Sequence, residues 1–135
     1  MTDDASRVRF CKTYKHKHEA FHAIKWLIKH LKTQYGIVVK IWRIDGGKEF
    51  TVTEIKKLID HLGAIIEITT PYTPEQDGVS ERSIRMLCER TRTTMIDQGI
   101  PEFLWPEILI AIITVTNVTA TQTIKDMTLY EFFMN

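Results

Sequence analysis

The sequence predicts one α/β domain, and three observations lead to that class. Segments rich in β-branched residues alternate with segments in which apolar residues recur every three or four positions. Gly36, Gly63 and Gly99 stand where the helical patterns stop. The chain has 135 residues, 44% hydrophobic and 26% charged, which is enough for one domain with one core. Alternating strands and helices of this kind are typical of the α/β class.

The first half of the chain predicts three strands and two helices. Residues 7–14 alternate charged with apolar side chains, as a strand with one solvated face does. Residues 18–35 carry a helical apolar stripe. Residues 37–44 form a nearly continuous β-branched run, which predicts a strand covered on both faces. Residues 51–62 begin with a capping-box pattern and continue as an amphipathic helix, and residues 64–70 predict another strand.

The second half predicts helices. Residues 79–98 have the charge and length of a surface helix, whose inward positions we expect to be Ile84, Leu87, Thr91 and Met95. The run WPEILIAIITV, residues 105–115, could form a buried strand, but its length and its proline near the start favour a buried helix. The final residues, TLYEFFMN, predict one further turn.

Composition excludes several classes of protein. Eighteen basic and 17 acidic side chains give a net charge of +1, so any nucleic-acid partner must depend on local features. Cys11 and Cys88 are far apart and belong to no CxxC pair, which argues against a disulfide framework and a thiolate zinc site. The acidic start and the lack of a membrane-length apolar run predict a soluble intracellular protein with no membrane partner.

Two carboxylates stand out by their surroundings. Asp45 follows a buried strand and precedes two glycines, at the edge of an α/β sheet where ligands bind, although Asp-Gly is also ordinary turn chemistry. Glu81 stands where a helix is expected to begin, a position that the helix dipole also favours for acids. Glu49 lies near Asp45 but is expected to face solvent. Two carboxylates from separate elements suit Mg²⁺, and paired ions can activate an attacking oxygen and stabilise the leaving oxygen of a phosphodiester.

Two motifs resemble the integrase catalytic core of retroviruses and long-terminal-repeat retrotransposons, most closely the copia type. RIDGGKEF (residues 43–50) is similar to the motif with the family's second acid, and TPYTPEQDGVSERSIRML (residues 70–87) to the motif with the third. TDDASR looks like the family's hairpin turn, and FLWPEILIAIITVTN and TLYEFF look like its following helix and the region after it, so the likeness covers essentially the whole chain. The resemblance implies a ribonuclease H-like fold, a five-stranded mixed sheet flanked by helices.

The resemblance also implies an activity and its ligands. The family carries out metal-dependent polynucleotidyl transfer, trimming element DNA ends and joining them to target DNA. By resemblance Asp45 is the second metal ligand and Glu81 the third, and Mg²⁺ or Mn²⁺ is the cofactor. The resemblance also implies a nuclear location and a possible homo-oligomer. His16, His18 and His22 lack the CxxC partner of the family's zinc domain and are read as solvated.

The sequence departs from the family pattern in ways that change the expectation. The family's first metal-binding aspartate lies on its first strand, before the turn that TDDASR resembles. Asp3 and Asp4 fall in that turn, away from the site, and Gly46 replaces the usual Asn. The 135 residues therefore match a partial core, residues 1–135, without the first strand and most of the second. We expect weakened metal binding, no appreciable strand transfer, and an exposed apolar strand edge that lowers solubility.

A candidate DNA-contacting surface lies on the helix that carries Glu81. Arg85 is one turn beyond Glu81, Arg92 lies close to the same face, and Arg82 is adjacent, so these cations could neutralise phosphates. The alternative is a solvated face with intrahelical ion pairs, Glu81 with Arg85 and Glu89 with Arg90 or Arg92. Trp42 and Trp105 are expected in the core.

The sequence thus predicts a partial integrase core that acts in DNA integration. Two other functions stay open: a catalytically inactive nucleic-acid or protein-binding remnant, and a ribonuclease H-like nuclease that only hydrolyses.

Overall fold

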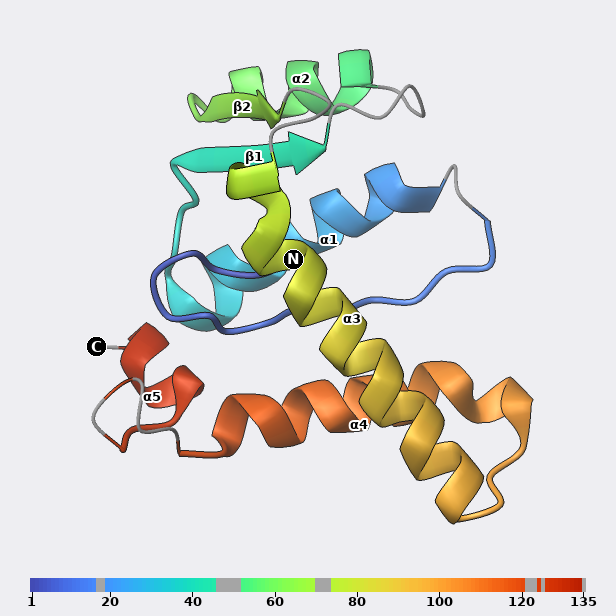
Figure 1. The fold of residues 1–135 in the computed structure, drawn as a ribbon. Coiled ribbons are helices and arrows are strands. Elements are labelled where there is room, and N and C mark those ends of the chain that lie inside the picture. The colour runs from blue at the N-terminus through green and yellow to red at the C-terminus, as the bar shows by residue number, and fades with distance from the viewer. Residues whose placement is uncertain (17–18, 46–51, 70–73, 121–123, 125, 135) are drawn as a thin grey trace. The chain divides into compact units, whose positions relative to one another are not determined.

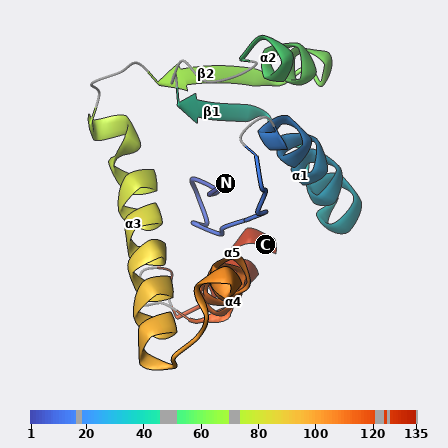
Figure 2. The same ribbon diagram turned by 90° about the vertical axis from the view of Figure 1, so that its right-hand side faces the viewer.

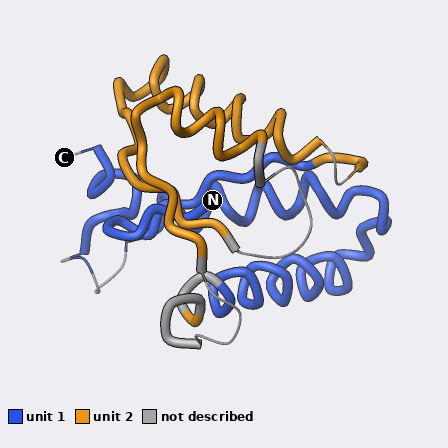
Figure 3. Tube along the Cα trace, turned by 90° about the horizontal axis from the view of Figure 1, so that it is seen from above, with its two compact units in different colours: residues 1–13, 79–135 blue, residues 14–78 orange. Residues whose placement is uncertain are grey.

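The chain forms two compact units in the computed structural model, which describes residues 1–135 except 17–18, 46–51, 70–73, 121–123, 125 and 135. Unit 2 is residues 14–78, and unit 1 joins residues 1–13 to residues 79–135 (Figure 3). The elements of unit 2 are α1 (Ala20–Tyr35), β1 (Ile41–Asp45), α2 (Val52–His61) and β2 (Ile65–Thr69). They are followed by α3 (Pro74–Asp97), the 3₁₀ helix η2 (Glu102–Leu104), α4 (Trp105–Val118) and α5 (Leu129–Met134) (Figure 1).

Among its described residues, unit 2 is built on two parallel strands. β1 pairs with β2 in a register that runs from Ile41 opposite Ile65 to Asp45 opposite Thr69. The helix between them, α2, lies along β2 and also contacts α1 (Figures 1 and 2). The α/β class predicted from the sequence is therefore confirmed for the described residues. A five-stranded ribonuclease H-like sheet stays a prediction.

One face of the sheet is covered and the other is open. Trp42 is buried, as predicted, together with Leu27 and Leu31 of α1 and Ile55 and Ile59 of α2. Because side chains alternate along a strand, Ile41 and its partner Ile65 point to the opposite face. Ile41 is 53% exposed and Ile65 is 61% exposed. The prediction that residues 37–44 form a strand covered on both faces is wrong: only residues 41–45 are strand, and one face is solvated.

The predicted strand at residues 7–14 is also wrong. Within that stretch only Arg9 makes a β-bridge, an isolated antiparallel one with Thr2. Residues 2–7 form a tight turn in which Asp3 accepts hydrogen bonds from the Ser6 backbone N–H (2.8 Å) and hydroxyl (2.7 Å). A strand needs a neighbour for its N–H and C=O groups. In the described chain, backbone hydrogen bonds join residues 7, 8 and 10 of this stretch to residues 1–3, which is too short a pairing for a strand.

Helix ends follow the predicted glycines. Gly36 has φ 67° and caps α1, with its N–H donating to the carbonyl of Lys32 at 3.1 Å. Gly63 and Gly99 also have positive φ and follow α2 and α3 closely. The left-handed conformation that closes a helix in this way is easiest for glycine.

Unit 1 has its core between α3 and α4. Leu87 of α3 packs against Leu109 and Ile113 of α4, with Cys11 from the first segment against them. The prediction that residues 105–115 are helical is confirmed, but the helix is only half buried. Trp105, expected in the core, is 39% exposed.

The short helix α5 packs on α4 and begins with a capping box. The Thr128 backbone N–H donates to the Glu131 carboxylate at 2.8 Å, and the Glu131 N–H donates to the Thr128 hydroxyl at 3.0 Å. The backbone hydrogen bond, and then the hydroxyl, lower the pKa of Glu131. The predicted final turn is therefore present as a capped helix.

Candidate metal and nucleic-acid site

Asp45 is the last residue of β1, at the carboxyl end of the sheet. Its backbone lies opposite Thr69, the last residue of β2, so both parallel strands end at the same edge. Trp42, three residues earlier, anchors the strand in the core of unit 2. An edge of this kind is where α/β sheets bind ligands. Residues 46–51, which follow Asp45, lie outside the described residues. The predicted turn at Gly46 and the predicted solvent-facing side chain of Glu49 therefore stay predictions.

Glu81 lies on α3 with its side chain exposed to solvent. The helix begins at Pro74, five residues before the predicted start, which makes Glu81 its eighth residue. The expectation that Glu81 lies in a first helical turn is therefore wrong. Because the dipole effect falls off within the first turn, the helix dipole does not explain an acid at this depth.

The two carboxylates belong to different units, Asp45 to unit 2 and Glu81 to unit 1. Their convergence on one metal stays a prediction. Within the ranges that the structure describes, no three His, Cys, Asp or Glu side chains gather as a ready-made metal cluster. The donor type nevertheless fits a hard cation such as Mg²⁺, which binds few protein carboxylates and keeps several waters.

Asp3 and Asp4 are occupied in the first turn of unit 1. Asp3 binds Ser6, and Asp4 pairs with the Arg7 guanidinium at 2.9 Å. Residues 4–6 form a turn, as the resemblance of TDDASR to a hairpin turn predicts.

Arg82, Arg85 and Arg92 are all exposed on α3. At 100° per residue, Arg85 and Arg92 lie within about 40° of Glu81 around the helix axis. In the part of the chain that is described, these arginines and Glu81 form no ion pair, so the intrahelical pairing expected for a merely solvated face is not formed. The arginines keep their charge available to an anion beside Glu81.

The inward face of this helix differs from the predicted one. Leu87, Thr91 and Met95 are buried, as expected, but Ile84 is 62% exposed and Ser83 is buried in its place. Ser83 accepts a hydrogen bond of 2.6 Å from the Arg9 Nε, a contact between residues 74 positions apart. The sequence pattern assigned Arg9 to a solvated strand face and carries no signal for this contact.

The described helices include none long and apolar enough to cross a membrane.

Comparison with known proteins places the chain in a transposon context. No family model matches it. It is 30% identical over 105 residues to the Retrovirus-related Pol polyprotein from transposon TNT 1-94 of Nicotiana tabacum, covering 78% of this chain and 8% of the polyprotein. It is 29% identical over 79 residues to the Transposon Ty1-DR6 Gag-Pol polyprotein of Saccharomyces cerevisiae, covering 58% of this chain and 4% of the polyprotein.

A third relative is the Truncated transposon Ty1-A Gag-Pol polyprotein of Saccharomyces cerevisiae, 26% identical over 107 residues. That match covers 78% of this chain and 9% of the polyprotein, so the chain spans less than a tenth of the length of each of these relatives. The chain is therefore homologous to a segment of retrotransposon Pol and Gag-Pol polyproteins.

Proposed function

We propose that this chain is part of a copia-type integrase core that acts in retrotransposon DNA integration. One observation carries the proposal: the chain is homologous to a segment of retrotransposon polyproteins. The RIDGGKEF motif supports it, because its Asp45 ends a parallel strand. A ribonuclease H-like fold for the complete core, DNA ends and target DNA as partners, and a nuclear site of action follow from the same assignment.

In this proposal Asp45 and Glu81 hold Mg²⁺ or Mn²⁺. When bound, the metal activates the attacking oxygen and stabilises the leaving oxygen at a phosphodiester. Each carboxylate supplies the hard oxygen donors that Mg²⁺ and Mn²⁺ prefer. The proposal gives no metal-binding role to Cys11, which packs against the core of unit 1, or to the exposed Cys88. Arg85 and Arg92, on the same side of α3 as Glu81, neutralise the phosphates next to the metal.

Metal binding tests the assignment of the two carboxylates. We expect Mn²⁺ binding by the 135-residue chain, followed by electron paramagnetic resonance, to weaken roughly tenfold in both Asp45→Asn and Glu81→Gln, because each removes one charged ligand. Asp97→Asn, a substitution at an exposed acid at the other end of α3, is the matched control and should bind like the unchanged chain. Equal Mn²⁺ affinity in all three variants would overturn the assignment.

DNA binding is a separate test of the basic face of α3, the surface formed by Arg82, Arg85 and Arg92. We expect Arg85→Gln to weaken duplex binding at low salt and to reduce the slope of log affinity against log salt by about one, the signature of one lost phosphate contact. Lys57→Gln on α2 removes another exposed charge and should leave that slope unchanged. An unchanged slope in Arg85→Gln would remove Arg85 from the interface without affecting the metal assignment.

A further inference from the structure

Arg9 is held rigidly in unit 1 by two kinds of contact. Its backbone N–H donates to the Asn117 Oδ1 at 3.0 Å, and its carbonyl accepts from the Asn117 Nδ2 at 2.8 Å. Its side-chain Nε donates to the Ser83 hydroxyl at 2.6 Å. The first segment, α3 and α4 therefore together fix the direction of one guanidinium group.

The fixed guanidinium has an unused donor. Arg9 Nη1 is buried and finds no hydrogen-bond acceptor among the described residues. Guanidinium is a fork of five donors with no acceptor capacity, and leaving a charged donor both dehydrated and unpaired is unfavourable. A buried donor without a partner is the kind of group that a bound anion satisfies.

A second cation lies on the same side. Arg90 is seven residues, or about 10 Å along the axis, beyond Ser83 on α3, and it lies within about 20° of Ser83 around the helix axis. Arg90 is exposed and forms no hydrogen bond or ion pair in the described part of the chain. Burial, and then repulsion from Arg90 and Arg7, lowers the pKa of Arg9. Arg7 is already paired with Asp4, whereas Arg9 and Arg90 form no ion pair in the part of the chain that the structure describes.

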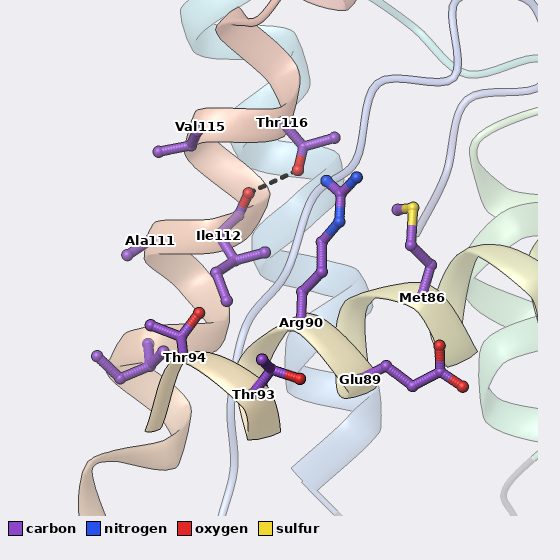
Figure 4. A pocket seen from close by; sticks show the side chains of 10 residues that line it. Met86, Glu89, Arg90, Thr93, Thr94, Ala111, Ile112, Val115 and Thr116 are labelled. Atoms are coloured by element: carbon purple, nitrogen blue, oxygen red, sulfur yellow. Dashed lines mark hydrogen bonds between the residues drawn. The ribbon is translucent and has the colours of Figure 1, made fainter. Parts of the chain in front are cut away.

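Arg90 also lines a groove of about 550 Å³ between α3 and α4. Figure 4 shows its side chain extending toward Thr116 on α4, while Glu89, which also lines the groove, points away from that pair. The Thr116 hydroxyl donates to the Ile112 carbonyl at 2.7 Å, so it is not the group that would bind an anion. Thr94, on the wall from α3, adds a hydroxyl, and Met86 lies between Ser83 and Arg90 along the helix.

We propose that Arg9 and Arg90 form an oxyanion site that accepts one phosphate group, either free phosphate or a phosphodiester. Two guanidinium groups that converge from separate segments can bind phosphate oxygens through charge-assisted, directional hydrogen bonds. The site is distinct from the basic face beside Glu81, because Arg90 lies about 140° around the helix from Arg85. It does not rest on the proposed function, since it needs neither Asp45 nor Glu81.

The test is phosphate binding by the full 135-residue chain at low salt, carried on a solubilising fusion whose own binding is subtracted. Inorganic phosphate is titrated while the Nε–H resonance of Arg9 is followed by NMR, which gives a dissociation constant and a location together. Arg90→Gln removes an exposed, unpaired charge, so the variant should fold normally. Lys57→Gln, on α2, is the matched control, and Arg9→Lys keeps the charge but loses the guanidinium fork. Since Arg9→Lys lacks the Arg9 resonance, its titration is followed through the Nε–H of Arg90.

We expect phosphate to shift the Arg9 resonance, and the dissociation constant to rise about tenfold in Arg90→Gln and in Arg9→Lys but not in Lys57→Gln. A short single-stranded oligonucleotide identifies the source. Competition by the oligonucleotide supports a phosphodiester ligand, and phosphate binding without competition supports free phosphate. No phosphate binding, or the same dissociation constant in Arg90→Gln and the unchanged chain, would overturn the site.

Discussion

At the scale of single residues, the side chain of Asn117 takes the place of a strand. Its amide forms with the Arg9 peptide the same pair of hydrogen bonds that a neighbouring β-strand would form, one donated and one accepted. The Arg9 peptide is therefore hydrogen-bonded although the predicted strand is absent, and its neighbours Val8 and Phe10 bond to residues 1–3. A sequence pattern predicts that a segment is extended and needs hydrogen-bond partners for its backbone. It does not predict that a side-chain amide 108 positions away provides them.

Replacing Asn117 with Ala tests this role. We expect a loss of about 1–3 kcal/mol in the free energy of unfolding, because the Arg9 N–H and C=O lose their partners in a part-buried place. Urea unfolding followed by circular dichroism measures it. Thr114→Ala on the same helix is the control, since its exposed hydroxyl bonds only to the Ile110 carbonyl one turn earlier, and it should shift the midpoint little. An equal midpoint for Asn117→Ala and the unchanged chain would contradict the assignment.

In the candidate site, too, the local sequence predicts some features of the structure and not others. Asp45 could be placed at a strand end because the β-branched run before it stops at Asp-Gly-Gly. Glu81 could not be placed correctly within its helix, because Pro74 is compatible with both a loop and the first turn of a helix. The role of both residues as metal ligands stays a prediction.

At the scale of elements, helices were predictable and the first strand was not. Helix ends depend on local chemistry, and the glycines after α1, α2 and α3 carry that signal. A strand depends on a partner that the local sequence does not specify, which is why the pattern of residues 7–14 predicts a strand that the structure does not have. The predicted inward face of α3 differs from the observed one by one position, since Ser83 is buried and Ile84 is exposed. A polar residue is favourable at position 83 because its hydroxyl accepts a hydrogen bond from the Arg9 guanidinium.

The cap of α1 provides a test that isolates backbone conformation. A Cβ built on Gly36 meets nothing within 4 Å, so a side chain has room and only the φ of 67° resists it. We expect Gly36→Ala to cost about 1 kcal/mol in unfolding free energy, and Gly36→Asn to cost less because Asn tolerates the left-handed region. Thermal unfolding of the two variants measures the difference. Equal losses of unfolding free energy in Gly36→Ala and Gly36→Asn would contradict this account, since the cost would then not depend on how well a residue tolerates a positive φ.

At the scale of the whole chain, each unit leaves apolar surface exposed. Unit 2 presents Ile41 and Ile65 side by side on the open face of the two parallel strands that the structure describes. A two-stranded parallel arrangement is marginal without more strands or a covering layer. Unit 1 exposes further large apolar residues on α3, η2 and α4, namely Ile84, Ile96, Phe103, Val115 and Val118. Exposed apolar surface of this extent promotes association with other chains.

We therefore expect the 135-residue chain to self-associate and to unfold without a sharp transition, because its stability margin depends on surfaces that lack partners. Sedimentation velocity over a range of concentrations and calorimetry measure these two properties. The double variant Ile41→Thr with Ile65→Thr should reduce association while changing stability by only about 0.5 kcal/mol, since both positions are solvated and threonine keeps the β preference. Ile59→Thr, at a fully buried position, is the opposite case and should cost roughly 2–4 kcal/mol without reducing association. A monodisperse monomer with one cooperative transition would show that the open face of unit 2 is tolerated as it stands.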